Sequence, residues 1–395
     1  MYRIPKLTLI GLSAAALGAC SGSTNGPSHG APSTSSTATD SGTCPRVASS
    51  TKPCPDIPDP CNLKSGFEGD EYCMAAPPAD KGIQIHFGPS NYTDTTETAK
   101  YTLAPGEEFN AYGIASIGTA EDKWYNRVTI HMRPGSHHLI NTVVTGDNLP
   151  VGFSTGGCPG TQIAGFPGTQ NLVYDSPPQG IPAPENVGMG GELPGNASLC
   201  LNYHAYNTTN ITHLREVWMN VYFVDASEVT QKEQSVFVLA GPFQGIPPGT
   251  KTELKASADI TEDGRIVSLF GHRHVYTDRF AVWKNEELVY DSWSWQEAAV
   301  FDYDSITNNP APNPTAKTDG AVSGDLDVKA GDKVSIECDV NNTSSQTLTF
   351  KNELYGGEMC ILFGSSLNTS VRSVGGVAAT PLEDGGKSAD APDAN

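Results

Sequence analysis

Short runs of β-branched and aromatic residues, bounded by Pro, Gly, Asn or Asp, recur through the middle of the chain. The clearest of these runs occupy residues 125–132, 218–224, 235–239 and 280–283. Such runs predict β-strands, because branched and aromatic side chains pack well on a pleated sheet. No window shows apolar residues at helical spacing over three turns, and no fixed repeat period is visible, which argues against helical bundles, solenoids and propellers. The pattern therefore predicts an all-β protein.

The strongest turn signal in the middle of the chain divides this pattern in two. Residues 239–242 read Leu-Ala-Gly-Pro, and residues 246–249 read Ile-Pro-Pro-Gly. A chain of 395 residues is also long for one hydrophobic core and has room for two. We therefore expect two β-sandwich domains, residues 60–229 and residues 230–372, with the boundary near residue 230.

The two ends of the chain have a different composition. Residues 21 to about 50 are mostly Ser, Thr, Gly, Pro and Ala, and the chain beyond Arg372 again turns to small and acidic residues. Segments with so little apolar surface cannot offset the entropy of ordering. We expect a flexible stalk over residues 20–59 and a disordered acidic tail over residues 373–395.

The first residues resemble a bacterial lipoprotein signal peptide. Arg3 and Lys6 precede an apolar run over residues 7–17, and Leu17-Gly18-Ala19-Cys20 closes it with small residues before a cysteine. The resemblance implies that residues 1–19 are removed and that Cys20 carries a lipid. The protein would then be anchored in the bacterial cell envelope, at the periplasmic or outer-membrane face. An ordinary secretory signal is the alternative, and both predict export.

Charge excludes one class of partner. The chain has 24 Lys+Arg against 44 Asp+Glu, a formal net charge of −20. This charge repels a polyphosphate, so we expect no nucleic-acid partner. Beyond the N-terminus no apolar run approaches the roughly 20 residues of a membrane-spanning helix, so we expect membrane contact only through the N-terminal lipid.

Export also decides how the cysteines are interpreted. Removing Cys20 from the nine cysteines leaves eight, an even number that predicts disulfides in an oxidising compartment. Four of them are close together in the sequence, and four are spread over the rest of the chain. The first group is Cys44, Cys54, Cys61 and Cys73, and the second is Cys158, Cys200, Cys338 and Cys360. The first group would fasten the start of the folded region, but composition alone leaves the pairing open.

The candidate chemistry lies in five histidines and one methionine. His137 and His138 are adjacent, and at a strand end or bulge both could turn toward one ion, completed by His204 from another strand. His272 and His274 are two residues apart, so on a strand they point to the same face. Met359 offers a thioether, a soft ligand that favours Cu(I).

Each of these elements alone also fits a simpler explanation, either a surface histidine pair or, for Met359, an apolar core. The other histidines are assigned no metal. We expect His213 in a loop, His29 in the stalk, and His86 and His131 in structural roles, with His131 close enough to the doublet to support it.

Taken together, the order of these residues resembles the copper type II, ascorbate-dependent monooxygenases, which include the peptidylglycine and dopamine hydroxylating enzymes. The resemblance covers roughly residues 80–365. It implies two jelly-roll-like antiparallel β-sandwich domains, each holding one copper, with the two ions facing each other across a solvent-filled cleft. It implies His137, His138 and His204 as ligands of one copper, His272, His274 and Met359 as ligands of the other, and a disulfide between Cys338 and Cys360.

The resemblance also implies a division of roles. The copper of His272, His274 and Met359 would be the reacting centre, which uses dioxygen to hydroxylate a C–H bond. The other copper would store and deliver an electron, and ascorbate or another small reductant would recharge both. The aromatic run from Trp293 to Gln296 falls where the family has a similar one. We expect a monomer acting on a small molecule.

Several positions depart from the peptide-hydroxylating members. Phe270 stands where they have an arginine that holds the substrate carboxylate, and Ile361 and Phe363 stand where they have an asparagine and a tyrosine. These losses predict a small or weakly polar substrate. Asn202 replaces a glutamine before the third histidine, which puts any proton or electron role there in doubt.

Three classes of function remain open at this point. The first is the copper monooxygenase, and the second is a non-catalytic copper-binding or copper-delivery lipoprotein. The third is a structural or adhesive surface lipoprotein. Zinc is a competing metal at the three-imidazole site, since three histidines with an open fourth position also suit zinc hydrolysis.

Overall fold

The computed structural model describes residues 59–146, 149, 151–154, 157–171, 188–295, 300–301, 306–307, 326–375 and 378–381. The predictions for the signal peptide, Cys20, the stalk before residue 59, His29, Cys44, Cys54 and Gln296 lie outside these residues. Of the interpretable residues, 53% are in strands and 4% in helices, so the all-β prediction is confirmed. The four strand runs predicted from the sequence lie within β4, β11, β12 and β15.

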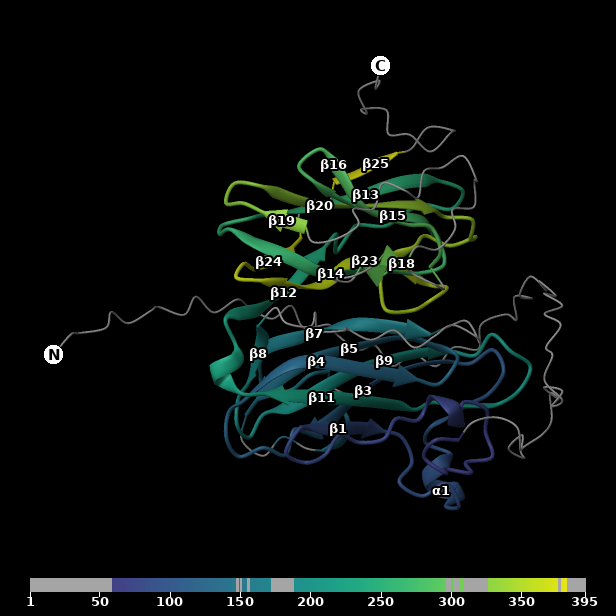
Figure 1. Cartoon of the computed structure of the whole chain (residues 1–395). Helices are drawn as coiled ribbons and strands as arrows, with labels where there is room; N and C mark the ends of the chain where they lie inside the picture. Colours follow the sequence, from purple (N-terminus) through teal and green to yellow (C-terminus); the bar gives the residue numbers. More distant parts are fainter. Residues whose placement is uncertain are drawn as a thin grey trace.

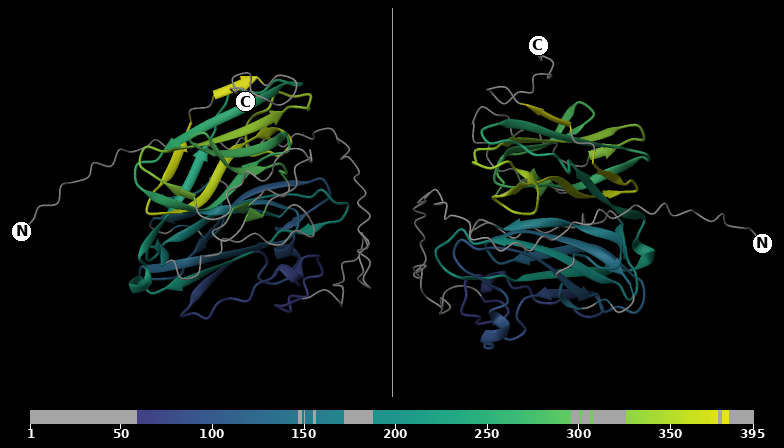
Figure 2. Two further views of the ribbon diagram at one scale, coloured as in Figure 1. Left: turned by 45° about the horizontal axis from the view of Figure 1, so that its top comes forward. Right: turned by 180° about the vertical axis from the view of Figure 1, so that it is seen from behind.

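Two β-sandwiches are stacked on each other (Figures 1 and 2). In the N-terminal sandwich, one sheet has the order β6-β3-β9-β5-β7, and the other contains β1-β11-β4-β8. The elements are η1 (Asp70–Tyr72), β1 (Gly82–Phe87), α1 (Thr95–Thr98), β2 (Thr102–Leu103), β3 (Glu108–Ser116), β4 (Lys123–Met132), β5 (Ser136–Thr145), β6 (Gly152–Ser154), β7 (Thr161–Asn171), β8 (Met189–Leu193), β9 (Ser198–Tyr206), β10 (His213–Leu214) and β11 (Val217–Val224).

The C-terminal sandwich begins with β12 and also has two main sheets. One has the order β16-β15-β20-β13-β25, and the other is built on β12-β23-β14. The elements are η2 (Ala226–Glu228), β12 (Gln231–Leu239), β13 (Lys251–Asp259), β14 (Gly264–Arg273), β15 (Thr277–Lys284), β16 (Glu287–Ser292), β17 (Val300–Phe301), β18 (Ile306–Thr307), β19 (Leu326–Val328), β20 (Lys333–Asn341), β21 (Thr349–Phe350), β22 (Gly357–Glu358), β23 (Cys360–Leu367), β24 (Val371–Val374) and β25 (Ala378–Pro381).

Each sandwich has its own apolar core, and the two are joined in two ways. The N-terminal core lies between β4 and β11 on one side and β5 and β9 on the other, and the C-terminal core lies between β14 and β23 on one side and β13 and β20 on the other. Short parallel pairing of β8 with β12, at Gln231 and Lys232, makes one sheet continuous through both. The sheet of β5 and β9 also faces the sheet of β14 and β23 (Figure 1).

A matching loop follows a central strand in each sandwich. After β9, Asn207 donates two hydrogen bonds through Nδ2 to backbone carbonyls, and its Oδ1 accepts from Thr209. After β20, Asn342 and Ser344 repeat this arrangement. The sequence shows no repeat period because the motif needs only an asparagine and a hydroxyl residue two positions later. The carbonyls belong to Leu103 and Ile211 in the first loop, and to Ile246 and Gln346 in the second.

Order extends past residue 372, where the sequence analysis placed the start of a disordered tail. Strand β24 pairs with β12, and β25 pairs with β13 along Ala378–Pro381. The correction has a simple physical reason. Both segments satisfy their backbone groups by adding to existing sheets, so they do not need a core of their own.

Three disulfides fasten the described part of the chain, which is expected for a protein of an oxidising compartment. They join Cys61 to Cys73, Cys158 to Cys200, and Cys338 to Cys360, with S–S distances of 1.99, 2.09 and 2.08 Å. The third is the pair that the family resemblance implied. Within the described residues, no helix has the length and apolar character needed to cross a membrane.

Candidate metal centre

The five candidate histidines come from strands that face each other across the two sandwiches. His137 and His138 lie at the start of β5, and His138 is directly opposite His204 on β9. The register between β5 and β9 shifts between Ser136 and His138. This irregularity breaks the strict alternation of side chains, so that both rings of the doublet can reach the same site. His272 lies near the end of β14, and His274 directly follows that strand.

The structure brings all five imidazoles into one cluster. The ring centroid of His137 lies 5.0 Å from those of His204 and His272, and 5.2 Å from those of His138 and His274. His138 and His272, from opposite sandwiches, are 4.6 Å apart. The resemblance had implied two ligand sets separated by solvent. The structure differs here, because the rings of the two sandwiches are in contact.

The ligand geometry also crosses the boundary between the sandwiches. Two sets of three histidines have nitrogens within 4.8 Å of one another, and each could hold a metal ion. One set is His137, His204 and His274, and the other is His137, His138 and His272. Both sets include His137 and both mix the two sandwiches, whereas the sequence analysis had assigned each sandwich its own set.

The hydrogen bonding of the cluster fits a metal. None of the five histidines is more than 1% exposed. Seven of their ring nitrogens have no hydrogen-bond partner, namely both nitrogens of His137 and His272, Nδ1 of His138 and His204, and Nε2 of His274. Buried polar atoms without partners are costly. Each neutral ring has one unprotonated nitrogen, so five of these atoms are lone pairs that metal binding could satisfy.

Three oxygen acceptors fix which nitrogen faces inward. His138 Nε2 donates to Asn202 Oδ1 at 2.9 Å, and His204 Nε2 donates to Glu108 Oε1 at 2.7 Å. His274 Nδ1 donates to the carbonyl of Gly357 at 3.3 Å. In each ring the second nitrogen is therefore unprotonated and available as a ligand, which is the usual arrangement around metal-binding histidines.

The electrostatics of the cluster keep the rings neutral. Burial lowers the pKa of His138, His204 and His274 to about 3. Burial, followed by repulsion from the neighbouring histidines, lowers the pKa of His137 and His272 well below the ordinary value. Neutral imidazole is the form that binds metals, so the site is ready for a cation near pH 7.

Met359 lies beside the cluster, and its side chain packs in an apolar group. It is 8% exposed and contacts Phe270, Ile361 and Phe363 in the cluster of residues between the sandwiches. The ring of Phe363 is in turn 6.3 Å from that of His272. Arg273 of β14 pairs with Cys360 of β23, so the backbone of Met359 lies at the end of the strand pair that carries His272 and leads to His274.

Glu358 anchors the segment that carries both His274 and Met359. Its buried carboxylate accepts hydrogen bonds from the backbone N–H groups of His274, Met359 and Tyr276 at 2.6, 2.9 and 3.2 Å. Burial raises the pKa of Glu358 to about 7. The disulfide from Cys360 to Cys338 holds the next residue, so the turn after β14 and the start of β23 are fixed together.

Arg273 was not singled out from the sequence, yet it supports the cluster from behind. It lies between the two histidines of the pair and is fully buried. Its guanidinium donates to Ser292 Oγ at 2.9 Å and to the carbonyl of Ser294 at 2.7 Å. These bonds hold the segment leading to Trp295, whose ring centroid is 6.1 Å from that of His137.

The sequence analysis also gave no role to Glu108. Glu108 lies two residues before Asn110, which pairs with His204 on β9, so both side chains are on the same face of the sheet as His204. The only sequence signal was a carboxylate and an amide at strand spacing, which is common on solvent-exposed strands. The contact between Glu108 and His204 depends on the pairing of β3 with β9, so it could not be predicted from the sequence.

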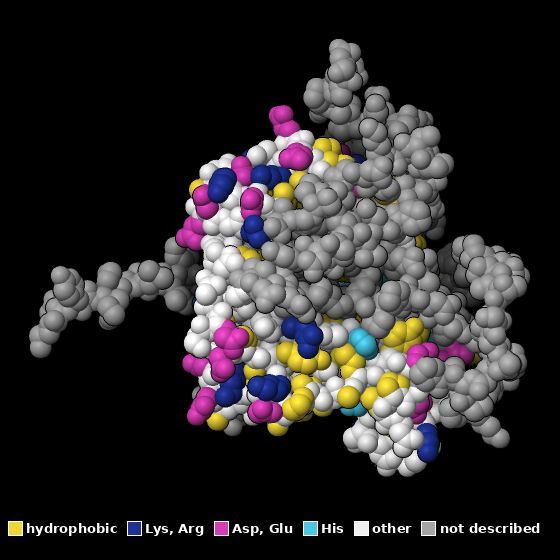
Figure 3. Space-filling view, viewed as in Figure 1, with side chains coloured by type: hydrophobic (Ala, Val, Ile, Leu, Met, Phe, Trp, Pro, Cys, Tyr) yellow, Lys and Arg dark blue, Asp and Glu magenta, His cyan; other side chains and the backbone are white. Residues whose placement is uncertain are grey.

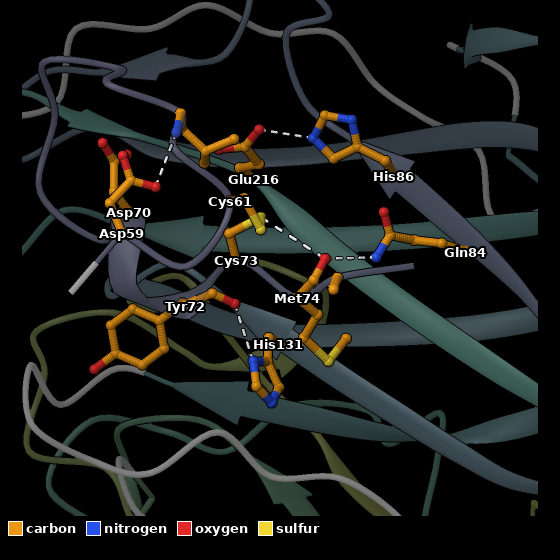
Figure 4. The surroundings of a disulfide bond; sticks show 12 residues. Asp59, Cys61, Asp70, Tyr72, Cys73, Met74, Gln84, His86, His131 and Glu216 are labelled. Carbon is orange, nitrogen blue, oxygen red and sulfur yellow. Dashed lines mark hydrogen bonds and ion pairs between the residues drawn. A yellow bond between two sulfur atoms is a disulfide. The ribbon is translucent and has the colours of Figure 1, made fainter. Parts of the chain in front are cut away.

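The other described histidines, His86, His131 and His213, belong to neither ligand set. His131 Nδ1 donates to the carbonyl of Tyr72 at 2.9 Å, and His86 pairs with Glu216 at 2.7 Å (Figure 4). Both make contacts within the N-terminal sandwich, and their structural roles stay predictions. His213 differs from the predicted loop residue: it lies in β10, is 4% exposed and bonds Thr209 at 2.7 Å. Two-residue strands leave no detectable sequence pattern.

No model of a known protein family matches this chain, and no curated protein sequence matches it. The fold and the site define a disulfide-bonded double β-sandwich with a histidine cluster that could hold a metal ion.

Proposed function

We propose that this protein is a copper-dependent monooxygenase that hydroxylates a small or weakly polar substrate, with dioxygen and a reductant such as ascorbate. The observation that carries the proposal is the convergence of five buried, neutral imidazoles with seven unpartnered nitrogens between two sandwiches. Imidazole suits copper in both of its common oxidation states, and a nearby thioether favours Cu(I).

The donor set argues against a structural zinc site, which usually includes thiolates, because the described cysteines of this chain are all in disulfides. Against a three-histidine zinc, the proposal of copper rests on the Met359 thioether, a soft ligand that favours Cu(I). The cluster instead offers five imidazoles next to Met359. Copper held there would supply one-electron transfers and the activation of dioxygen.

The chain's own residues would do three things around the metal. Asn202, Glu108 and Gly357 orient the imidazoles through their second nitrogens. Arg273 and Glu358 fix the backbone that presents His272, His274 and Met359. Closure of the sandwiches excludes water from reactive species, which would otherwise be lost to side reactions.

The apolar group beside His272 supports a weakly polar substrate. Phe270, Ile361 and Phe363 share the face of β14 and β23 that turns toward the N-terminal sandwich, and Ile140 packs against them. These side chains offer no charge or hydrogen bond to a carboxylate. An apolar molecule entering between the sandwiches would find matching surface next to the histidines.

A non-catalytic copper-binding or copper-delivery protein is the second candidate. The observation that favours it is the complete burial of the five histidines. A metal held by fully buried ligands suits storage or delivery as well as it suits catalysis.

One experiment separates these candidates. The full-length protein is loaded with copper under reducing conditions, and its metal content is measured by mass spectrometry. Oxygen uptake is then followed with ascorbate and a panel of small aromatic and aliphatic compounds, and the products are analysed after reaction in ¹⁸O₂. Labelled product with one oxygen atom supports the monooxygenase. Stable copper binding without labelled product supports the binding protein, and absence of copper binding refutes both.

The location follows the same proposal. The disulfides indicate an oxidising compartment. We propose that a lipid on Cys20 anchors the protein in the bacterial envelope and that the serine-rich stalk separates the sandwiches from the membrane.

A further inference from the structure

A short segment of the C-terminal sandwich crosses to the N-terminal sandwich at the edge of the histidine cluster. It comprises residues 352–354 and leads through β22 to Met359. Leu354 N donates to Glu108 Oε1 at 2.7 Å, and Asn110 Nδ2 donates to the carbonyl of Asn352 at 3.3 Å. The Asn352 side chain adds a longer bond of 3.4 Å to Asn202 Oδ1. We call residues 352–354 the crossing segment.

Glu108 has two partners on the same oxygen. Oε1 accepts from Leu354 N of the C-terminal sandwich and from His204 Nε2 of the N-terminal sandwich, both at 2.7 Å. Asn202 Oδ1 repeats the arrangement, since it accepts from His138 Nε2 at 2.9 Å and from Asn352. Two histidines of one sandwich therefore share their acceptors with the crossing segment of the other.

The position of Glu108 makes this sharing sensitive to closure. The Glu108 side chain is 29% exposed, and Glu108 is the first residue of β3. If the sandwiches came apart, the carboxylate would lose the Leu354 donor and could turn toward solvent. His204 would then lose the acceptor that holds its Nδ1 toward the cluster.

We propose that Glu108 is a positioning residue that couples closure of the two sandwiches to the orientation of His204 as a metal ligand. The inference rests on the proposed metal site and adds a mechanism of regulation to it. Because coupling is reciprocal, a metal bound in the cluster stabilises the crossing segment, and an ordered crossing segment strengthens metal binding.

The test measures both ends of this coupling in the full-length protein. Hydrogen–deuterium exchange reports protection of the Leu354 amide with and without copper, and competition with a Cu(I) chelator reports affinity. In Glu108→Ala we expect faster exchange at Leu354 in the metal-free protein and about 10- to 100-fold weaker copper binding. Copper should slow the Leu354 exchange in the unaltered protein and do so less in the variant.

Two further variants serve as controls. Glu108→Gln keeps an acceptor oxygen, so it should restore part of the protection and part of the affinity. Glu107→Ala removes a neighbouring carboxylate that accepts only a local bond from Ala104 N at 2.7 Å among those described. It should leave both readouts unchanged.

The coupling is wrong if Glu108→Ala changes one readout without the other, or if it behaves like Glu107→Ala. Failure of the proposed function would look different. In that case the unaltered protein would bind no copper, while exchange at Leu354 in the metal-free variants would still show whether Glu108 holds the crossing segment.

Discussion

His137 is the central residue of the cluster. Its ring contacts those of the four other histidines, and both of its nitrogens lack partners. It is also the one histidine shared by both possible ligand sets. In the sequence, His137 could have been one half of a surface histidine pair. In the structure, its ring contacts histidines of both sandwiches.

We predict that His137→Ala loses more bound copper than loss of any other single histidine of the cluster. The reason is that both ligand sets depend on this ring. Copper content after dialysis against a weak chelator measures the effect, and oxygen uptake measures the loss of turnover. His131→Gln is the matched control, since His131 is in neither ligand set and a glutamine amide can keep its bond to the carbonyl of Tyr72. Full copper content and turnover in His137→Ala would contradict this role.

For Met359, two substitutions separate packing from ligation. Met359→Leu keeps roughly the side-chain volume within the apolar group, so we expect a stability change below about 1.5 kcal/mol. Met359→Ala leaves a cavity and should cost roughly 2–5 kcal/mol. If the sulfur is a ligand, both variants keep histidine-bound copper but lose hydroxylation. Normal turnover in Met359→Leu would show that Met359 only packs.

At the level of elements, β5 and the loop before it depend on a buried charge network. Arg133 is 0% exposed, and its guanidinium bonds Glu216 Oε2 at 2.7 Å and Asp70 Oδ1 at 2.8 Å. Asp70 belongs to the N-terminal segment that the Cys61–Cys73 disulfide closes (Figure 4). The network therefore connects the segment between Cys61 and Cys73 to Arg133, which lies four residues before His137.

We predict that Arg133→Met destabilises the protein by roughly 3–5 kcal/mol, because Glu216 and Asp70 would remain buried without their partner. Denaturant unfolding monitored by tryptophan fluorescence measures the loss. Arg127→Met, on the exposed face of the same strand β4, should change stability by less than about 1 kcal/mol. Equal losses in the two variants would mean that the buried network contributes nothing specific.

At the scale of the whole molecule, the cluster makes stability depend on pH. The five histidines have folded-state pKa values below the ordinary 6.5, and three are lowered to about 3. The unfolded chain therefore takes up protons as pH falls below 6.5, while the folded chain does not. The free energy of unfolding of the metal-free protein must decrease between pH 6.5 and 3 on their account.

We predict a loss of about 2 kcal/mol per such histidine between pH 7.5 and 5.0 in the metal-free protein. Burial raises the pKa of four carboxylates, which act in the opposite direction: Glu358 to about 7, Asp339 to about 6, and Glu108 and Glu233. Burial also lowers the pKa of His131 and His213, so the histidines outnumber these carboxylates. Denaturant unfolding at the two pH values tests the net effect, and His204→Gln should reduce it. A protein equally stable at both would show that the rings are not held neutral.

The surface gives the whole molecule a further property. Acidic and basic side chains are interspersed over the described face of the N-terminal sandwich (Figure 3). The formal net charge is −20. That the protein has no nucleic-acid partner stays a prediction from this net charge.

The sequence by itself determined the class of fold and the residues that can carry chemistry. Branched and aromatic runs specify strands locally, because their preference for a pleated sheet acts within a few residues. The spacing of His272 and His274 specified a common face for the same reason. The even number of cysteines after Cys20 predicted disulfides, but it did not show which cysteines pair with each other.

Only the tertiary structure decided how these residues combine. The single cluster of five imidazoles depends on how the sheet of β5 and β9 faces the sheet of β14 and β23, and no local pattern encodes that packing. The roles of Glu108 and Arg273 likewise arise from contacts between residues far apart in the chain. Side-chain neighbours across a sheet or between sandwiches are set by pairing and burial of the whole chain, which act over distances that sequence periodicity cannot report.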